Sequence, residues 1–409
     1  MAETKSLFDG LLKNIEFAFT WTGLSLESRK RSSIDTIRCR FVFIFNFIWL
    51  NSDIVGAVSW FIEGIENGKT ITELTYLFPC TTLSFLASMK SVYHIKKEDL
   101  VNQIVEDMRT LEEKGRDKIN DKIEVIINKE VKFLKFVTTL LNTLNVMMVA
   151  VFTSSPLILI TIKYVKTGTL ELMLPFLDVY PFDPYDMRLY PFLYIKQIWS
   201  ECVVLLEICA TDYFFYTCCT YIRVQFLLLQ QDIEELIPCK RISVGVIKYD
   251  EDVRRKFLDL VIWHQQLISS AEMLEVIYAK STLMNFLISS IIICLTGFNV
   301  TTITDIAFIV IFMTFLFMGL LQVFFFCYFG DLLMRSSMEL NDSIYNCRWY
   351  LMDSSFGKDL QFMQKRSQKP CKLTAWGFAD VNLRAFMRVL SSSWSYFALL
   401  KTVYSAQRS

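Results

Sequence analysis

Long apolar stretches constrain this sequence most, because a helix needs about 20 mainly apolar residues to cross a bilayer. Seven stretches reach that length, at residues 41–62, 72–93, 135–161, 193–222, 278–298, 305–330 and 383–404. The last stretch is the weakest, since serines and Lys401 interrupt it. Hydrophobic residues make up 53% of the chain, and proline and glycine are scarce. We therefore expect an all-α membrane protein with seven transmembrane helices.

The loop charges predict an orientation, because Lys and Arg are retained in cytoplasmic loops. Basic residues gather before the first span, between the second and third, after the fourth and after the sixth. The segments 63–71, 162–192 and 299–304 are poor in them. The N-terminus is therefore expected to be cytoplasmic and the C-terminus extracellular, the reverse of a G-protein-coupled receptor. The N-terminal residues lack the apolar core of a signal peptide, so the first span is expected to direct insertion.

The cytoplasmic segments have helical patterns of their own. Apolar residues recur at helical spacing within 223–277, and the pattern of the sixth span continues beyond residue 330. We expect these to be long cytoplasmic helix extensions that pack on each other or on other subunits. The predicted parts are a cytoplasmic N-terminal segment (1–40), a six-helix transmembrane bundle (41–330), a cytoplasmic anchor segment (331–382), and a seventh helix with a short extracellular tail (383–409).

No pattern in the sequence is typical of an enzyme. Of the two histidines, His264 lies in "WHQQ", and we interpret it as a helix-packing residue rather than a catalytic one. No ligands cluster at metal spacing, and a formal net charge of zero provides no basic surface for nucleic acid. The eleven cysteines lie in apolar runs or basic segments, which favours free thiols. We expect no catalytic residues, no metal and no cofactor.

Polar residues interrupt the first span at Asn51 and Asp53. A carboxylate inside a membrane is costly and is often functional. Asp53 either lines a water-filled path or a ligand pocket, or it is satisfied by Ser52 or a partner helix. The sequence leaves both interpretations open.

Aromatic and methionine side chains in spans two, three, four and six are candidates for a pocket that takes a small apolar ligand. These candidates are Phe78, Met147, Met148, Phe152, Trp199, Phe312, Met313 and Phe315. For any one of them, plain packing in the core or against lipid is the favoured alternative. A glycosylation sequon places Asn299 in an outer loop, whereas a second sequon, at Asn341, falls on the cytoplasmic side.

One stripe of the last span combines hydroxyl and apolar residues. At a helical period it comprises Ser392, Ser395, Leu399, Thr402 and Val403. A hydroxyl stripe closed by apolar side chains suits a hydrated pore with a dewetting gate. Alternatively, the serines permit close helix packing. Lys401 points away from the stripe and can reach the outer interface.

Two C-terminal segments and two shorter motifs carry a specific pattern. The two segments are "CYFGDLLMRSSMELNDSIYNCRWY" and "SSSWSYFALLKTVY". The two shorter motifs are "VYPFD" in an outer loop and the pair His264–Gln265. Through them the chain resembles the insect odorant receptor family over nearly its whole length. The family pattern matches at Cys327, Gly330, Ser337, Tyr345 and Trp349. Trp394 stands where the family more usually has a tyrosine.

The resemblance implies an odorant-gated, non-selective cation channel, a heterotetramer formed with a shared odorant co-receptor subunit. It implies a small, volatile, mostly apolar ligand in the outer part of the helical bundle, a pore for monovalent and divalent cations, and the plasma membrane of an olfactory neuron dendrite. It also implies a pore constriction at Leu399 and Val403, with Thr402 near the outer mouth, and a subunit anchor that includes Tyr345, Trp349 and His264.

The chain lacks the long insertion that co-receptor subunits carry between spans four and five, so the resemblance is to a ligand-tuning subunit. Three other classes are alternatives. They are a gustatory-type chemosensory channel, a seven-helix G-protein-coupled chemoreceptor of opposite topology, and a transporter. A transporter is expected to show internal repeats, and none is visible.

Overall fold

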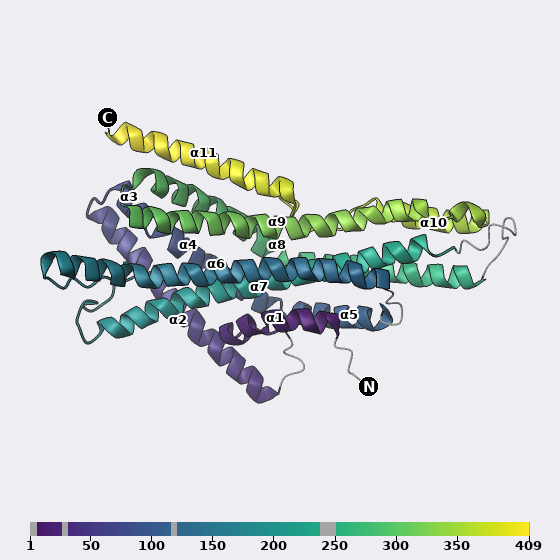
Figure 1. Ribbon diagram of the computed structural model, residues 1–409, viewed down its shortest axis with the longest axis horizontal. Coiled ribbons are helices and arrows are strands. Elements are labelled where there is room, and N and C mark those ends of the chain that lie inside the picture. The colour runs from purple at the N-terminus through teal and green to yellow at the C-terminus, as the bar shows by residue number, and fades with distance from the viewer. Residues whose placement is uncertain (1–5, 27–31, 116–120, 238–250, 409) are drawn as a thin grey trace.

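The computed structural model describes residues 6–26, 32–115, 121–237 and 251–408, and the described chain is almost entirely helical (Figure 1). The long helices are α2 (Ser33–Glu66), α4 (Phe78–Lys96), α6 (Asp121–Thr167), α7 (Tyr190–Glu234), α8 (Glu251–Thr302), α9 (Ile306–Asn346) and α11 (Leu383–Arg408). The shorter ones are α1 (Leu7–Thr22), α3 (Ile71–Thr75), α5 (Glu98–Gly115), the 3₁₀ helix η4 (Trp349–Leu351) and α10 (Ser354–Ser367). The predicted all-α fold is confirmed.

Five of the described helices are long and apolar enough to cross a membrane, namely α2, α6, α7, α8 and α9. The second predicted span corresponds to α3 and α4, and the seventh to α11. Neither α4 nor α11 is among the five helices that are long and apolar enough to cross a membrane. Lys90 and several serines make α4 more polar, and Arg384, Arg388 and Lys401 do the same for α11. The second predicted span is also divided, because α3 ends before Pro79 starts the first turn of α4. The count of seven transmembrane helices stays a prediction.

Helix α7 occupies the centre of the bundle. It packs against α1, α2, α4, α6, α8 and α9. Of its most apolar window, 89% is buried inside the protein, whereas the corresponding window of α6 is only 17% buried. An apolar helix that is buried all round is typical of the core of a helical membrane protein. The other helices therefore form a shell around α7, and α6 presents its apolar surface outward.

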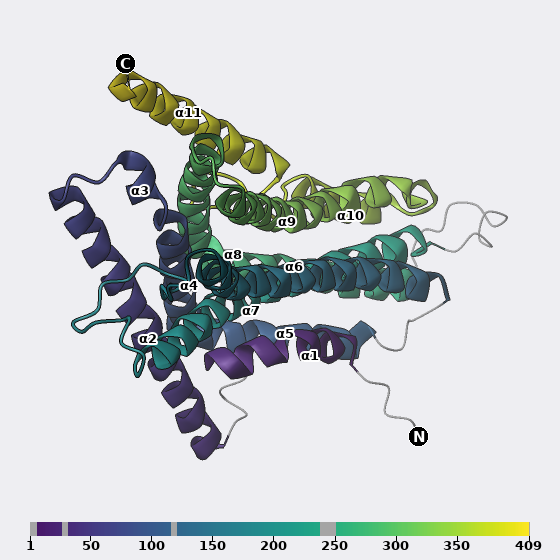
Figure 2. The same ribbon diagram turned by 60° about the vertical axis from the view of Figure 1, so that its left-hand side comes forward.

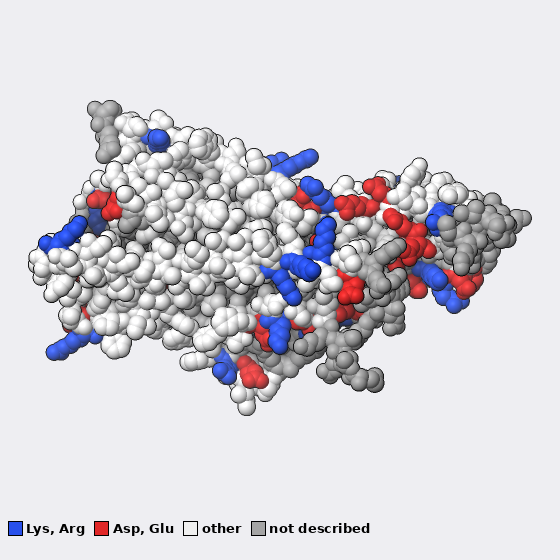
Figure 3. Space-filling model, in the orientation of Figure 1, with Lys and Arg blue, Asp and Glu red and all other residues white. Residues whose placement is uncertain are grey.

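Several helices extend far beyond an apolar body, as the sequence predicts. Figures 1 and 2 show α6, α7, α8 and α9 running together toward the end that carries α10, while α11 lies obliquely on α8 and α9. On the face shown in Figure 3, charged side chains gather over this end, and the opposite half of the molecule is mostly free of them. Long helix extensions are confirmed, and their cytoplasmic position stays a prediction.

The N-terminal helix is part of the core, which the sequence interpretation of a simple cytoplasmic segment did not foresee. One face of α1, with Phe8, Ile15 and Phe19, is fully buried, and the helix packs along α7. Its first turn is fixed by α5, because the backbone N–H of Phe8 donates to the Glu112 carboxylate at 3.1 Å. Gly23 ends α1 with φ 74°, where a side chain would clash with the backbone of α2 at Phe43.

A buried ion pair joins three helices near the middle of the bundle. The Lys90 ammonium group of α4 lies 2.6 Å from one carboxylate oxygen of Asp212 on α7, and both side chains are almost completely buried. The other oxygen accepts a 2.9 Å hydrogen bond from the Gln322 amide of α9. Removing one partner from a buried pair leaves an uncompensated charge, which is far more costly than losing an exposed pair.

We therefore predict that Lys90→Met lowers the free energy of unfolding by about 3–5 kcal/mol, because it leaves the Asp212 carboxylate without its cation. The matched control is Lys163→Met, which removes a similar charge from the exposed pair with Glu171 and is expected to cost under about 1 kcal/mol. Denaturant titration of the purified chain in detergent measures both values. Equal losses in the two variants would contradict the structural role of the buried pair.

Candidate functional site

Three neighbouring cavities lie inside the bundle. The inner cavity, of about 60 Å³, is lined by residues of α4, α6, α7, α8 and α9. The middle cavity, of about 50 Å³, lies nearer α2 and includes Phe176 and Asp178 from the loop between α6 and α7. The outer cavity is much larger, at about 590 Å³, and lies under the same loop.

Shared side chains show that these cavities form a series. The inner and middle cavities share Leu83, Met148, Leu205 and Phe315. The middle and outer cavities share Leu77, Cys80 and Phe176. Each boundary is thus a single layer of mostly apolar side chains. Rotations of these side chains would connect the outer cavity with the buried ion pair.

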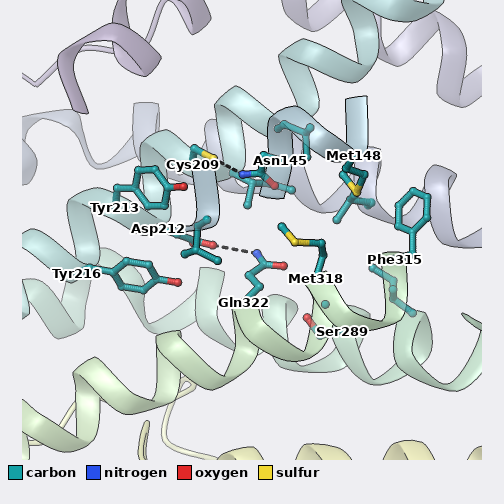
Figure 4. Close-up of a pocket in the computed structure, with 16 residues that line it drawn as sticks. Asn145, Met148, Cys209, Asp212, Tyr213, Tyr216, Ser289, Phe315, Met318 and Gln322 are labelled. Atoms are coloured by element: carbon teal, nitrogen blue, oxygen red, sulfur yellow. Dashed lines mark hydrogen bonds between the residues drawn. The ribbon is translucent and has the colours of Figure 1, made fainter. Parts of the chain in front are cut away.

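The inner cavity has a polar end and an apolar end (Figure 4). At the polar end Gln322 donates to Asp212, and the Asn145 amide donates to the Cys209 thiol at 3.1 Å. At the other end Met148 and Phe315 face the cavity. An apolar pocket with a few convergent polar groups is typical of a site for a small organic molecule.

The middle cavity resolves the two interpretations of Asp53. Its carboxylate pairs with the Lys196 ammonium group and accepts a hydrogen bond from the Ser200 hydroxyl, both on α7. Asp53 also lines the cavity. It is therefore satisfied by a partner helix and belongs to a pocket at the same time. The Ser52 hydroxyl takes no part, because it donates to the backbone carbonyl of Trp49.

The loop between α6 and α7 is fixed over the cavities by Gln197 of α7. The Gln197 amide accepts a hydrogen bond from the backbone N–H of Phe176 and donates one to its carbonyl, each at 3.0 Å. Asp178 follows in the same loop and is largely enclosed. Burial, and then the nearby charge of Asp53, raise the pKa of Asp178 to about 7. Two carboxyl groups, Asp53 and Asp178, therefore lie close together at this side of the middle cavity.

The structure divides the eight predicted pocket residues into two groups. Met148 and Phe315 line the inner and middle cavities, and Phe152 and Phe312 line the outer one. The other four are not among the lining residues: Phe78, Met147, Trp199 and Met313.

The four residues that do not line the cavities have other surroundings. Met147 and Met313 are about half exposed on the outside of the bundle. Phe78 packs against Phe61, with ring centroids 5.8 Å apart. The indole N–H of Trp199 donates to Asn46 at 3.2 Å. Their contacts are therefore those of packing residues.

Sequence reasoning missed the polar residues that line the cavities. Asp212, Gln322 and Glu201 lie inside predicted spans, as Asp53 does. An ionisable residue in a membrane span is a functional candidate by default. Applied to span four, the rule used for Asp53 would have found Glu201 and Asp212.

The stripe of α11 faces away from the bundle. Its five members are exposed, and Leu399 is 64% exposed. The opposite face is buried, with Val389 and Ser393 toward α8 and α9. The serines on the stripe are therefore not used for packing within this chain. Lys401 lies near the ring of Phe397 on α11 itself.

The three predicted anchor residues do not share one environment. Tyr345 is 67% exposed and Trp349, in η4, is also exposed, so both are available to another surface. His264 is buried in α8 and meets the ring of Phe226 edge to face. The interpretation of His264 as a packing residue agrees with this position.

The environment of Asn299 argues against the predicted glycosylation. Asn299 lies in the last turns of α8, is fully buried, and bonds to Thr75 through both side-chain atoms. Its amide nitrogen donates to the Thr75 carbonyl at 3.0 Å, and its oxygen accepts from the Thr75 hydroxyl at 2.8 Å. A glycan would break both bonds and has no room. Helix α8 extends about one turn further than the predicted span, to Thr302, and this residue is buried in the core.

An all-helical, multi-pass membrane protein with small cavities around a central helix is the class that these features define. A family model described as 7tm Odorant receptor matches residues 70–394, and the chain belongs to this family. The similar curated proteins include putative odorant receptor 92a of Drosophila melanogaster, 28% identical over 89% of this chain and 88% of that protein. Odorant receptor 67c of the same species is 26% identical over 88% and 87%, respectively.

A solved structure shows that the fold is shared. The olfactory receptor OR5 from Machilis hrabei in complex with eugenol superposes with a TM-score of 0.76 at 15% identity, covering 97% of both chains. A second structure of OR5, which is described without eugenol, gives a TM-score of 0.77. The relatives are odorant receptors rather than enzymes, so this chain is a receptor as well.

Met148 and Met147 are adjacent residues that provide a direct test of the cavity. Met148 is 2% exposed and lines two cavities, whereas Met147 is 57% exposed on the outside. We predict that Met148→Ala raises the half-effective ligand concentration about tenfold, as expected for losing 1–2 kcal/mol of apolar contact. Met147→Ala is the control and is expected to change it less than about twofold. Concentration–response curves of ligand-evoked current measure both, and a larger effect of Met147→Ala would contradict the assignment.

His264 predicts a pH dependence of stability. Burial, and then the nearby Arg366, lower the pKa of His264 to about 4, below its usual 6.5. The unfolded chain therefore binds the proton more readily, and stability is lost as the pH falls from 6.5 toward 4. Between pH 7.5 and pH 5 we expect this residue to contribute a loss of about 2 kcal/mol in unfolding free energy.

The loss should be absent in His264→Gln, which keeps a polar group that does not titrate. Denaturant titrations of both proteins at the two pH values give the difference. An identical pH dependence in the variant would contradict a buried, neutral His264.

Proposed function

We propose that this chain is the odorant-binding subunit of a heteromeric ligand-gated cation channel, formed with an odorant co-receptor subunit in the plasma membrane of olfactory neuron dendrites. The observation that carries the proposal is the exposed stripe of α11. A membrane helix that buries one face on its own bundle and leaves hydroxyl and apolar side chains uncovered suits a water-filled pore between subunits. The extracellular position of the end of α11 is part of the proposal.

The cavities offer a place for a small volatile ligand of mostly apolar character. Their walls combine methionine and aromatic side chains with a few polar groups, which suits adaptable recognition. The solved receptor of similar fold is described in complex with eugenol, a small organic molecule. That likeness supports a ligand of this size in this chain.

Helix α9 links the cavities to the proposed pore. Phe315 and Gln322 of α9 line the inner cavity, and two residues further on Phe324 meets Phe386 of α11 edge to face, 5.5 Å between centroids. At the other end of α11, Tyr404 packs on Phe298 of α8 at 5.4 Å. A ligand that favours one position of α9 would therefore move α11. It opens the channel only if it binds the open arrangement better than the closed one.

In this mechanism Leu399 and Val403 close the pore by excluding water, and Ser392, Ser395 and Thr402 contact water and cations when it opens. The exposed aromatics Tyr345 and Trp349 would contact other subunits at the anchor. The topology with a cytoplasmic N-terminus separates this proposal from a G-protein-coupled receptor.

Leu399 and its neighbour Leu400 test the proposed gate. We predict that Leu399→Ala, expressed with a co-receptor, raises the current without ligand about tenfold, because weakening the closed state by about 1.4 kcal/mol shifts the populations by that factor. Leu400→Ala makes the same chemical change off the stripe and is expected to leave that current within about twofold. Voltage-clamp recordings measure it. The proposed gate is wrong if both variants behave alike.

A further inference from the structure

The middle cavity is lined by more acidic side chains than basic ones. Three carboxyl groups line it, from Asp53, Asp178 and Glu201. Within the described part of the chain, Lys196 is the cation that pairs with one of them, and its partner is Asp53. The cavity therefore has acidic groups that the positive charge beside it does not balance.

The hydroxyl groups that line the same cavity do not offer their hydrogens to a ligand. Thr81 donates to the backbone carbonyl of Leu77, and Ser84 donates to that of Cys80, each at 3.1 Å. Ser200 donates to Asp53. All three hydrogens are therefore committed to acceptors within the chain. The cavity therefore offers hydrogen-bond acceptors to a ligand. A ligand that can only accept hydrogen bonds finds no free hydroxyl donor among these three residues and gains little binding energy from them.

Glu201 is the acid that lacks a partner. The residue is 8% exposed, and among the described residues no donor reaches its Oε2 atom. It projects from α7 one residue after Ser200 and lines the cavity with Val204 and Leu205 of the same helix. Burying an unpaired carboxylate is costly, and a hydrogen-bonded cation reduces that cost. Asp178, in contrast, accepts hydrogen bonds from the Gln197 amide at 3.3 Å and the Tyr180 hydroxyl at 3.4 Å.

From these contacts we propose that the middle cavity recognises the ammonium group of a small volatile amine, with Glu201 as the residue that binds it. This inference rests on the proposed function and names the ligand class for its site. The ammonium group donates to Glu201 and adds a second positive charge beside three carboxyl groups, of which only Asp53 is paired with a cation. A cavity needs about 10–15 Å³ to hold one water, so about 50 Å³ accommodates this group with a carbon or two.

The hydrocarbon part of the ligand extends past Phe176 and Leu77 into the outer cavity, whose lining is largely apolar. Its volume of about 590 Å³ exceeds what a short alkyl chain or one ring needs. Selectivity for the charged group and tolerance for the hydrocarbon are therefore separate properties. Substitutions at Glu201 should affect only the first.

Three probes of equal size test the proposal: hexylamine, 1-hexanol and 2-hexanone. In cells that express the chain with a co-receptor, hexylamine is expected to evoke current at a lower concentration than the other two. Glu201→Gln should raise its half-effective concentration about tenfold or more, because a charge-assisted bond is lost. The response to 1-hexanol should stay within about twofold. Equal half-effective concentrations of 2-hexanone and hexylamine on the unmodified chain overturn the proposal. This comparison needs no variant.

The matched control is Glu207→Gln, which makes the same change at another buried acid of α7. Glu207 is not among the residues that line the three cavities. Its substitution should leave the ratio of hexylamine to 1-hexanol sensitivity unchanged. Equal loss of amine sensitivity in the two variants overturns the role of Glu201.

A second measurement separates this proposal from the channel function. The unfolding temperature of the purified chain in lipid nanodiscs is recorded with each probe, without any current. Greater stabilisation by hexylamine than by 1-hexanol, with the difference lost in Glu201→Gln, supports the amine site. If no probe evokes current in that case, the channel proposal fails and the amine site stands. Equal stabilisation by the probes overturns the amine site, whatever the recordings show.

Discussion

The burial of α7 is the constraint on which the rest of the structure depends. This helix contacts six others, and most partners for its charged groups come from them, because 89% of its most apolar window is buried inside the protein. Asp212 is satisfied by Lys90 and Gln322, and Lys196 is satisfied by Asp53. Each of these interactions also fixes the position of a neighbouring helix relative to α7.

Aromatic contacts complete this arrangement. Phe215 of α7 stacks on Phe326 of α9 with centroids 4.1 Å apart, and Tyr216 stacks on Phe329 at 4.7 Å. Such contacts matter in a membrane, where helices associate through close packing rather than through a hydrophobic driving force. Tyr216 also lines the inner cavity, so this aromatic layer closes the series of cavities at its inner end. Recognition can therefore vary at one end while the core and its extensions stay the same.

The sequence predicted where the helices lie in the chain better than it predicted which face of each helix is buried. The span 305–330 coincides with the first part of α9 to within one residue, and 383–404 lies within α11, because a long segment of mainly apolar residues without proline predicts a helix. They do not determine which way each residue points. Met147 and Met148 were equal candidates, yet about 100° of helical rotation places one outside and the other in a cavity.

Long-range contacts limited the prediction in a different way. Asn299 satisfies a local sequon pattern, and only its bonds to Thr75 on a distant segment show that it is buried. Similarly, α1 is short and amphipathic, and its contacts with α7 and with Glu112 of α5 join segments that are far apart in the sequence. The resemblance of the C-terminal motifs identified the family, but the residues around the cavities had to come from the folded chain.

The central claim is that binding in the bundle opens a water-filled pore along the exposed stripe of α11. It is tested most directly by substituting cysteine at Thr402 and at Ser393, on opposite faces of the helix, and applying a membrane-impermeant thiol reagent from outside. We predict that ligand-evoked current through Thr402→Cys channels is blocked rapidly, and faster when the ligand is present. Channels with Ser393→Cys should react no faster than the unmodified protein. Equal reactivity at the two positions, or none at Thr402, would contradict the account.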